Sequence, residues 1–152
     1  NITPATKIVA YRFGIIYGNL LYQSNCIVDK LLQAWLNTDD ISIKATKASR
    51  SFVSLDDIVD VFLSSSKITE ECVHFSKLNI FNIQGPFSHP LLSIKNYING
   101  ASKSLEHYSP DEIIDSSADA KLVISDIQHL LGKHPKELKH YLNLFIQSSN
   151  KS

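Results

Sequence analysis

Several residue types and patterns are scarce or missing in this sequence. Its 152 residues include no methionine and only two cysteines, Cys26 and Cys72. These cysteines are far apart and belong to no CxxC motif, which predicts reduced thiols rather than a disulfide framework. No apolar run approaches the roughly 20 residues that span a bilayer, and the N-terminus lacks the features of a secretory signal peptide. We therefore expect a cytoplasmic protein with no membrane partner.

An excess of charge of one sign is also missing. The 15 basic and 15 acidic residues give a formal net charge of +0, which argues against a domain that binds nucleic-acid phosphates. A hydrophobic content of 43% is too high for a disordered chain. The length suits one domain or part of a larger one. Because no initiator methionine is present, we expect a fragment.

The common motifs of self-sufficient catalysis are missing as well. The sequence contains no GxGxxG, GxxxxGK[ST], GxSxG or HExxH. His129, His134 and His140 do not follow the spacing that would place them on one helix face, so no metal site is expected. The Asp39-Asp40 and Asp56-Asp57 pairs are adjacent, and neighbouring side chains point apart, which is poor geometry for acid/base catalysis. We therefore assign no catalytic residue.

Alternating strand and helix patterns predict an α/β fold. Strands are expected at residues 7–13, 41–45, 50–53 and 78–83, where apolar runs or alternating residues occur. Helices are expected to follow three cap residues, Asn25, Ser54 and Ser93, and to form again at residues 126–131 and 136–147. In the Ser54-x-x-Asp57 capping box, the paired aspartates are expected to be structural, with one capping the helix and the other bracing the adjoining loop.

Three segments are informative when read in order: Arg12–Gly18 (RFGIIYG), Arg50–Val59 (RSFVSLDDIV) and Phe81–Pro86 (FNIQGP). A weaker fourth, Ser125–Pro135, includes Leu-Leu-Gly and ends in proline. This series resembles the C-terminal half of the extended short-chain dehydrogenase/reductase family, which comprises nucleotide-sugar epimerases, dehydratases and ketoreductases. The resemblance runs from about Ile8 to about Phe145. It implies the last strands of a Rossmann-type parallel sheet and a small mixed α/β substrate lobe.

The same resemblance implies a division of labour. Members of the family bind NAD or NADP on an N-terminal Rossmann half with a Gly-rich turn, and they use a Tyr-x-x-x-Lys pair as acid/base. Neither feature is present, since none of the six tyrosines is followed by lysine at the fourth position. We therefore expect residues 1–152 to be the substrate-binding part of an NAD(P)-dependent enzyme. Alone, this part is expected neither to catalyse nor to bind the cofactor tightly.

Five candidate substrate-binding residues follow from the resemblance. Arg50 would contact the diphosphate, since a guanidinium can grip two phosphate oxygens; the alternative is a surface arginine at a strand edge. Asn25 would contact the substrate from a helix start or act only as a cap. Gly14 occupies a position where many epimerases have a substrate-binding asparagine, but it could simply permit a turn. Ser42 and Lys44 would lie on a strand that passes the nucleotide base, although many relatives have an apolar or aromatic residue in place of Lys44.

The predicted partner is a nucleotide sugar or a related sugar or steroid-like substrate. Relatives often have an arginine in the stretch that corresponds to residues 106–117, and this sequence has none there. This departure motivates a second hypothesis, a non-catalytic binding or regulatory module of the same fold, and a scaffold without ligand remains a third. The edges of the strands at 7–13 and 78–83 would be bare in a half-sheet. They predict a homo-oligomer or pairing with a missing N-terminal half.

Overall fold

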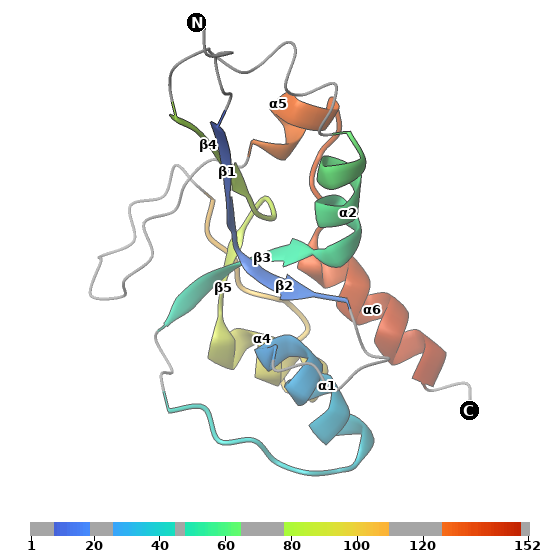
Figure 1. The fold of residues 1–152 in the computed structure, drawn as a ribbon. Coiled ribbons are helices and arrows are strands. Elements are labelled where there is room, and N and C mark those ends of the chain that lie inside the picture. Colours follow the sequence, from blue (N-terminus) through green and yellow to red (C-terminus); the bar gives the residue numbers. More distant parts are fainter. Residues whose placement is uncertain (1–7, 19–25, 45–47, 65–77, 110–125, 150–152) are drawn as a thin grey trace, which may run out of the picture.

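Two small β-sheets and their flanking helices are seen in a computed structural model that describes residues 8–18, 26–44, 48–64, 78–109 and 126–149. The strands are β1 (Ile8–Phe13), β2 (Ile15–Tyr17), β3 (Ser49–Ser54), β4 (Leu78–Ile83) and β5 (Ser88–Pro90). The helices are α1 (Ile27–Leu36), α2 (Leu55–Leu63), α4 (Leu91–Ile98), α5 (Ile127–Leu131) and α6 (Leu138–Ser149) (Figure 1). None of these helices is both long and apolar enough to cross a membrane.

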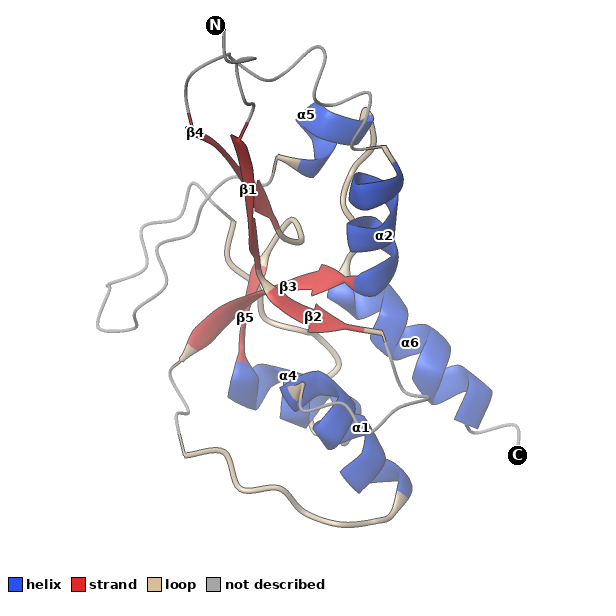
Figure 2. Ribbon diagram, in the orientation of Figure 1, coloured by secondary structure: helices blue, strands red, loops and turns tan. Residues whose placement is uncertain are grey.

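The sheets confirm the predicted α/β class. β1 and β4 form a parallel pair in which Ile8 is opposite Leu78. The second sheet has the order β2-β3-β5, with β2 parallel and β5 antiparallel to β3. The chain passes from the first sheet to the second at Gly14, whose N–H donates to the carbonyl of Ile83 at 3.0 Å. A parallel pair is thus followed by a small sheet with both parallel and antiparallel pairing (Figure 2).

Strand β3 separates two hydrophobic clusters because successive strand residues point to opposite faces. Phe52 packs into a cluster with α1, α4 and α6, whereas Val53 packs into one with α2, α5, β1 and β4. Both side chains are almost completely buried. Figure 1 accordingly shows α1 and α4 on one side of the second sheet, and α2 and α5 together beside β1 and β4. Side chains of one strand, β3, therefore pack into both clusters and fix the position of the two sheets relative to each other.

The helix caps are only partly as predicted. Ser54 caps α2 as expected, accepting a hydrogen bond from the N–H of Asp56 at 3.1 Å. The N-cap of α1 is Cys26, and Asn25, which was expected there, lies outside the described residues. The cap predicted at Ser93 is wrong, because α4 already begins at Leu91. The hydroxyl of Ser93 instead accepts from the N–H of Glu106 at 2.8 Å.

The strand predicted at residues 41–45 is wrong, since residues 41–44 form no strand. Ile41 and Ile43 are partly buried against the first hydrophobic cluster, which explains their alternating pattern. The carbonyl of Ile41 accepts from the ammonium of Lys95 at 2.8 Å, and this ammonium also pairs with Asp40. Alternation therefore reports which side chains are buried here, but not a strand, because a side chain rather than a neighbouring strand bonds this backbone.

Candidate functional site

Arg50 is the second residue of β3 and lies opposite His89 of β5. Residues directly opposite in an antiparallel pair have their side chains on the same face of the sheet. The Nη1 atom of Arg50 donates to the carbonyl of Ser49 at 2.9 Å, and the side chain is half-buried. Among the described residues, no carboxylate forms an ion pair with it. Most N–H donors of the guanidinium are therefore unused within the described residues, while the strand pairing fixes the backbone of Arg50.

Gly14 lies where the backbones of two strands come close. A Cβ at this position would be 2.9 Å from the carbonyl oxygen of Ser51 and 3.1 Å from its carbon. Since the obstacle is backbone, a side chain would require a shift of β3. The close approach alone explains the glycine, and it places Gly14 beside the residue that follows Arg50.

The other three candidates are not gathered around Arg50 by any described contact. Ser42 and Lys44 are exposed in the irregular segment after α1 and form no hydrogen bond or ion pair with a described residue. Asn25 lies outside the described residues. Of the four predicted residues that the structure describes, Gly14 lies against the strand that carries Arg50, and substrate contact by any of the five remains a prediction.

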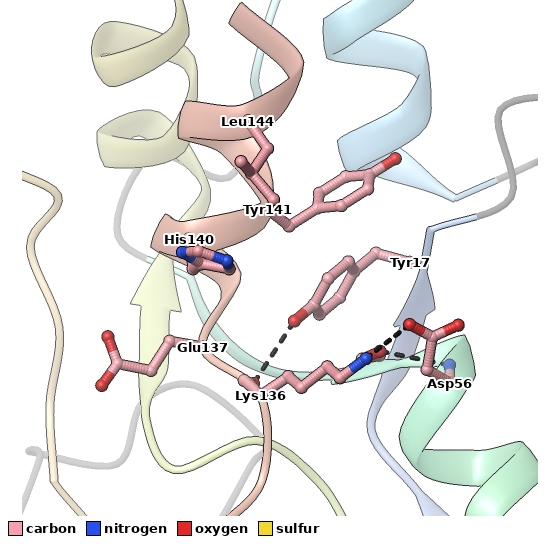
Figure 3. A pocket seen from close by; sticks show the side chains of 8 residues that line it. Tyr17, Asp56, Lys136, Glu137, His140, Tyr141 and Leu144 are labelled. Atoms are coloured by element: carbon pink, nitrogen blue, oxygen red, sulfur yellow. Dashed lines mark hydrogen bonds and ion pairs between the residues drawn. The ribbon is translucent and has the colours of Figure 1, made fainter. Parts of the chain in front are cut away.

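A cleft of about 610 Å³ opens where β2 and β3 end and α6 begins. The rings of Tyr17 and Tyr141 in this cleft have centroids 5.0 Å apart, and Figure 3 shows the two rings side by side. We call it the tyrosine cleft; it is lined by Tyr17, Ser54, Asp56, Lys136, Glu137, His140, Tyr141 and Leu144. The Tyr17 hydroxyl donates to the Lys136 carbonyl at 3.3 Å. Burial raises the pKa of both tyrosines, so the phenols stay protonated at neutral pH. None of the four predicted site residues that the structure describes lines this cleft.

A buried polar pair lies behind the tyrosine cleft. Both carboxylate oxygens of Asp29 and the hydroxyl of Tyr141 are buried and have no hydrogen-bond partner in the part of the chain that the structure describes. Burial raises the pKa of Tyr141 most, and the negative charges of Asp29 and Cys26 raise it further. Figure 3 shows the Tyr141 hydroxyl pointing away from Tyr17. These buried polar atoms come from two helices, Asp29 from α1 and Tyr141 from α6.

Asp57 connects α2 to the segment that precedes α6. Its side chain is fully buried; Oδ2 accepts from the backbone N–H of Lys136 at 2.8 Å, and Oδ1 lies 3.1 Å from the Lys133 ammonium. Lys133 also pairs with Asp60, whose pKa is lowered by that hydrogen bond. Burial alone would lower the pKa of Lys133, but its bonds to Asp60 and Asp57 outweigh burial and raise it. The expected bracing role is thus filled by Asp57, while Ser54 rather than an aspartate caps α2.

A second cavity, of about 310 Å³, lies beside β5. We call it the histidine cavity; it is lined by Phe87, His89, Ser104, Leu105, His107, Glu137 and Lys139. His89 is only 4% exposed, and burial lowers its pKa. The rings of Phe87 and His107 are 4.5 Å apart. Among the described residues, no group of three or more His, Cys, Asp or Glu side chains is arranged to hold a metal ion.

Sequence reasoning missed both cavities. His89 stands in a three-residue strand between Ser88 and Pro90 and belongs to no motif. Tyr141 is part of an ordinary amphipathic pattern in α6. Both cavities form between segments that are far apart in the sequence. The sequence indicated only that a histidine lies close to the end of a predicted strand.

The fold has solved counterparts, although no family model and no curated protein matches the sequence. UDP-glucose 4-epimerase from Thermotoga maritima, solved with UDP-glucose, is 20% identical with a TM-score of 0.61; the match covers 95% of this chain and 46% of that one. UDP-N-acetylglucosamine 4-epimerase from Bacillus cereus is 18% identical with a TM-score of 0.60, and the match covers 95% of this chain and 48% of that one. dTDP-glucose 4,6-dehydratase from Bacillus anthracis, solved with NAD, is 14% identical with a TM-score of 0.58, and the match covers 95% of this chain and 45% of that one.

These matches confirm the predicted resemblance as a likeness of fold. At such identities they show the fold alone. The chain spans just under half the length of the three enzymes. It therefore has the architecture of one part of an NAD-dependent nucleotide-sugar epimerase or dehydratase.

Proposed function

We propose that this chain is the substrate-binding part of an NAD(P)-dependent epimerase, dehydratase or reductase that acts on a nucleotide sugar. The observation that carries the proposal is the match of 95% of the chain to 46% of an epimerase solved with UDP-glucose. In this function Arg50 holds the diphosphate, because its guanidinium donors project from a rigid strand and have no carboxylate partner among the described residues. The remainder of the enzyme carries out hydride transfer and acid/base chemistry.

The described residues do not fit a dinucleotide cradle. Such a cradle needs a Gly-rich turn that leads from a strand into a helix N-terminus. After β1, however, the chain passes through Gly14 directly into β2. We therefore place the binding of NAD or NADP outside this chain and derive no step through the cofactor.

Isothermal titration calorimetry with UDP-, dTDP- and GDP-sugars tests the proposal. We expect one of these ligands to bind, with no NAD(P)H-linked turnover and no tight cofactor binding by the chain alone. Circular dichroism on the same sample establishes that the chain is folded. A folded chain that binds none of the three ligand classes would favour the alternative, a non-catalytic regulatory module. NAD(P)H-linked activity would contradict the assignment to one part of an enzyme.

We also propose that the β1–β4 sheet is the surface where the dinucleotide-binding part docks. Val9 and Tyr11 pack toward α2 and α5, so the alternate residues of β1 point to the opposite face. On that face Ile8 and Ile80 are 56% and 39% exposed. Within the described residues, β4 is the only strand that pairs with β1. Parallel sheets normally have both faces covered, and an additional parallel strand with its helix would cover this face and edge.

The chain alone is therefore expected to self-associate through this sheet. Light scattering over a concentration series should show an average mass that rises above the 17.0 kDa of one chain. Ile80→Lys should reduce the association because a charge on an exposed strand opposes edge and face pairing. Leu36→Lys, which places the same charge on a large exposed apolar residue of α1, away from this sheet, is the matched control. A monodisperse monomer at all concentrations would contradict the prediction.

A further inference from the structure

His89 lies next to Arg50, the proposed diphosphate-binding residue, on the same face of the second sheet. The two residues are direct partners in the β3–β5 register. The ring of Phe52, two residues after Arg50 and on the same face, has its centroid 6.3 Å from that of His89. A ligand whose phosphates are held by Arg50 would therefore present its neighbouring groups to the imidazole.

A single contact fixes the tautomer of His89. Its Nδ1 atom lies 2.8 Å from the carbonyl oxygen of Glu106, which is 17 positions further along the sequence. A carbonyl oxygen can only accept, so Nδ1 carries the proton and donates. In a neutral ring, Nε2 is then an acceptor. Nε2 has no partner among the described residues, and His89 lines the histidine cavity.

The surroundings of the ring favour its neutral form. Burial lowers the pKa of His89 most, and the neighbouring His107 lowers it further, while the hydrogen bond to Glu106 and the charge of Glu137 oppose this shift. The charged and titratable groups that face the ring come from three elements: Arg50 of β3, Glu106 and His107 after α4, and Glu137 and Lys139 at the start of α6. These groups carry charges of both signs, so their combined effect on the pKa of His89 does not outweigh the effect of burial.

We propose that His89 is a specificity-determining residue that accepts, through Nε2, a hydrogen bond from an N–H or O–H group of the nucleotide sugar bound at Arg50. This inference rests on the proposed function. The donor could be the imide N–H of a uracil or thymine base or a hydroxyl of the sugar. Titration with UDP, UDP-glucose and N3-methyl-UDP distinguishes these sources, since only N3-methyl-UDP lacks the imide proton.

The first test replaces the imidazole of His89 with a ring that has no hydrogen-bond acceptor. His89→Phe should weaken binding of UDP-glucose by roughly 2- to 10-fold, the effect of one neutral hydrogen bond, and His89→Gln, which restores an acceptor, should recover part of this loss. Ser93→Ala is the matched control, because it removes the other bond that holds Glu106 and leaves the imidazole in place. Equal affinities of wild type and His89→Phe would overturn the inference and leave the proposed function standing. A folded wild type that binds no nucleotide sugar would overturn both.

The second test uses the direction of the pH dependence. Protonation turns Nε2 into a donor, so wild-type affinity should fall as the pH is lowered through the His89 pKa. The diphosphate diester of UDP-glucose keeps its charge over this range. His89→Phe should abolish this dependence, and His107→Phe should retain it. Affinity that increases at acid pH and depends on His89 would overturn the inference, because that is the behaviour of a cationic anion-binding residue.

Discussion

Arg50→Ala is expected to weaken UDP-glucose binding by roughly 10- to 100-fold, the largest effect of any single substitution at the proposed site. Charge-assisted hydrogen bonds are stronger than neutral ones, and those to charged groups contribute about 1.5–3 kcal/mol each. Arg50 can form such bonds because, among the described residues, only its Nη1 atom is engaged, to the neighbouring carbonyl of Ser49. Calorimetry at low and high salt measures the effect, and the wild-type affinity should decrease with salt more than that of the variant.

Two controls separate a phosphate contact from a structural role. Arg50→Lys retains the positive charge but loses the planar fork, so it should recover part of the affinity. Arg12→Ala removes an exposed arginine of β1 and should leave binding unchanged. If Arg50→Ala binds UDP-glucose as tightly as the wild type while folding normally, Arg50 is a surface residue at a strand edge, which was the alternative considered from sequence.

Elements with strong local signals were predicted from the sequence. The strand at residues 78–83 has the observed bounds, since a mainly apolar segment (LNIFNI) is stopped by Gly85-Pro86. The helix after Ser54 begins where expected because a serine hydroxyl can satisfy the N–H two residues later. In both cases the residues that determine the structure lie within a few positions of one another.

Elements that depend on distant partners were not predicted. β2 and β5 are each only three residues long and are strands because β3 lies between them. The segment at 41–45 was wrongly predicted to be a strand. Its alternation comes from the packing of Ile41 and Ile43 on the first cluster, and residues 41–44 form no strand. Periodicity reveals which side chains are buried, whereas strand formation requires a backbone partner that periodicity cannot supply.

The same limit applies to the site. Arg50 was predicted as a site residue because its local segment resembles a family motif. The tautomer of His89 depends on the Glu106 carbonyl, and the acceptor role of Asp57 depends on Lys136, 79 residues away. A sequence shows that a histidine or an aspartate is present, but its chemistry follows from the group that the fold places beside it.

The second large effect is expected on stability. Asp57→Ala should lower the free energy of unfolding by about 3 kcal/mol. The substitution removes a buried carboxylate, so the N–H of Lys136 loses its acceptor and Lys133 loses its buried partner. Lys133 is partly exposed and still pairs with Asp60, which keeps the effect below that of breaking a fully buried ion pair. Urea denaturation followed by circular dichroism measures the change.

Lys136→Met is the matched control for this effect. It removes the exposed pair between the Lys136 ammonium and Asp56 but retains the backbone N–H that Asp57 accepts from. Exposed pairs contribute little, so its effect should stay below about 1 kcal/mol. Equal destabilisation by the two substitutions would show that the surface pair, and not Asp57, holds the start of α6 against α2.

The pH dependence of stability provides an independent check. Since the pKa of Lys133 is raised in the folded chain, its ion pairs stabilise fully below the ordinary lysine value of 10.5 and are lost as the pH rises through the folded value. Wild-type stability should therefore decline above 10.5, and Asp57→Ala should decline less, because one of the two carboxylates that raise this pKa is gone. An unchanged alkaline decline in Asp57→Ala would assign the raised pKa to Asp60 alone and confine the role of Asp57 to its bond with the Lys136 backbone.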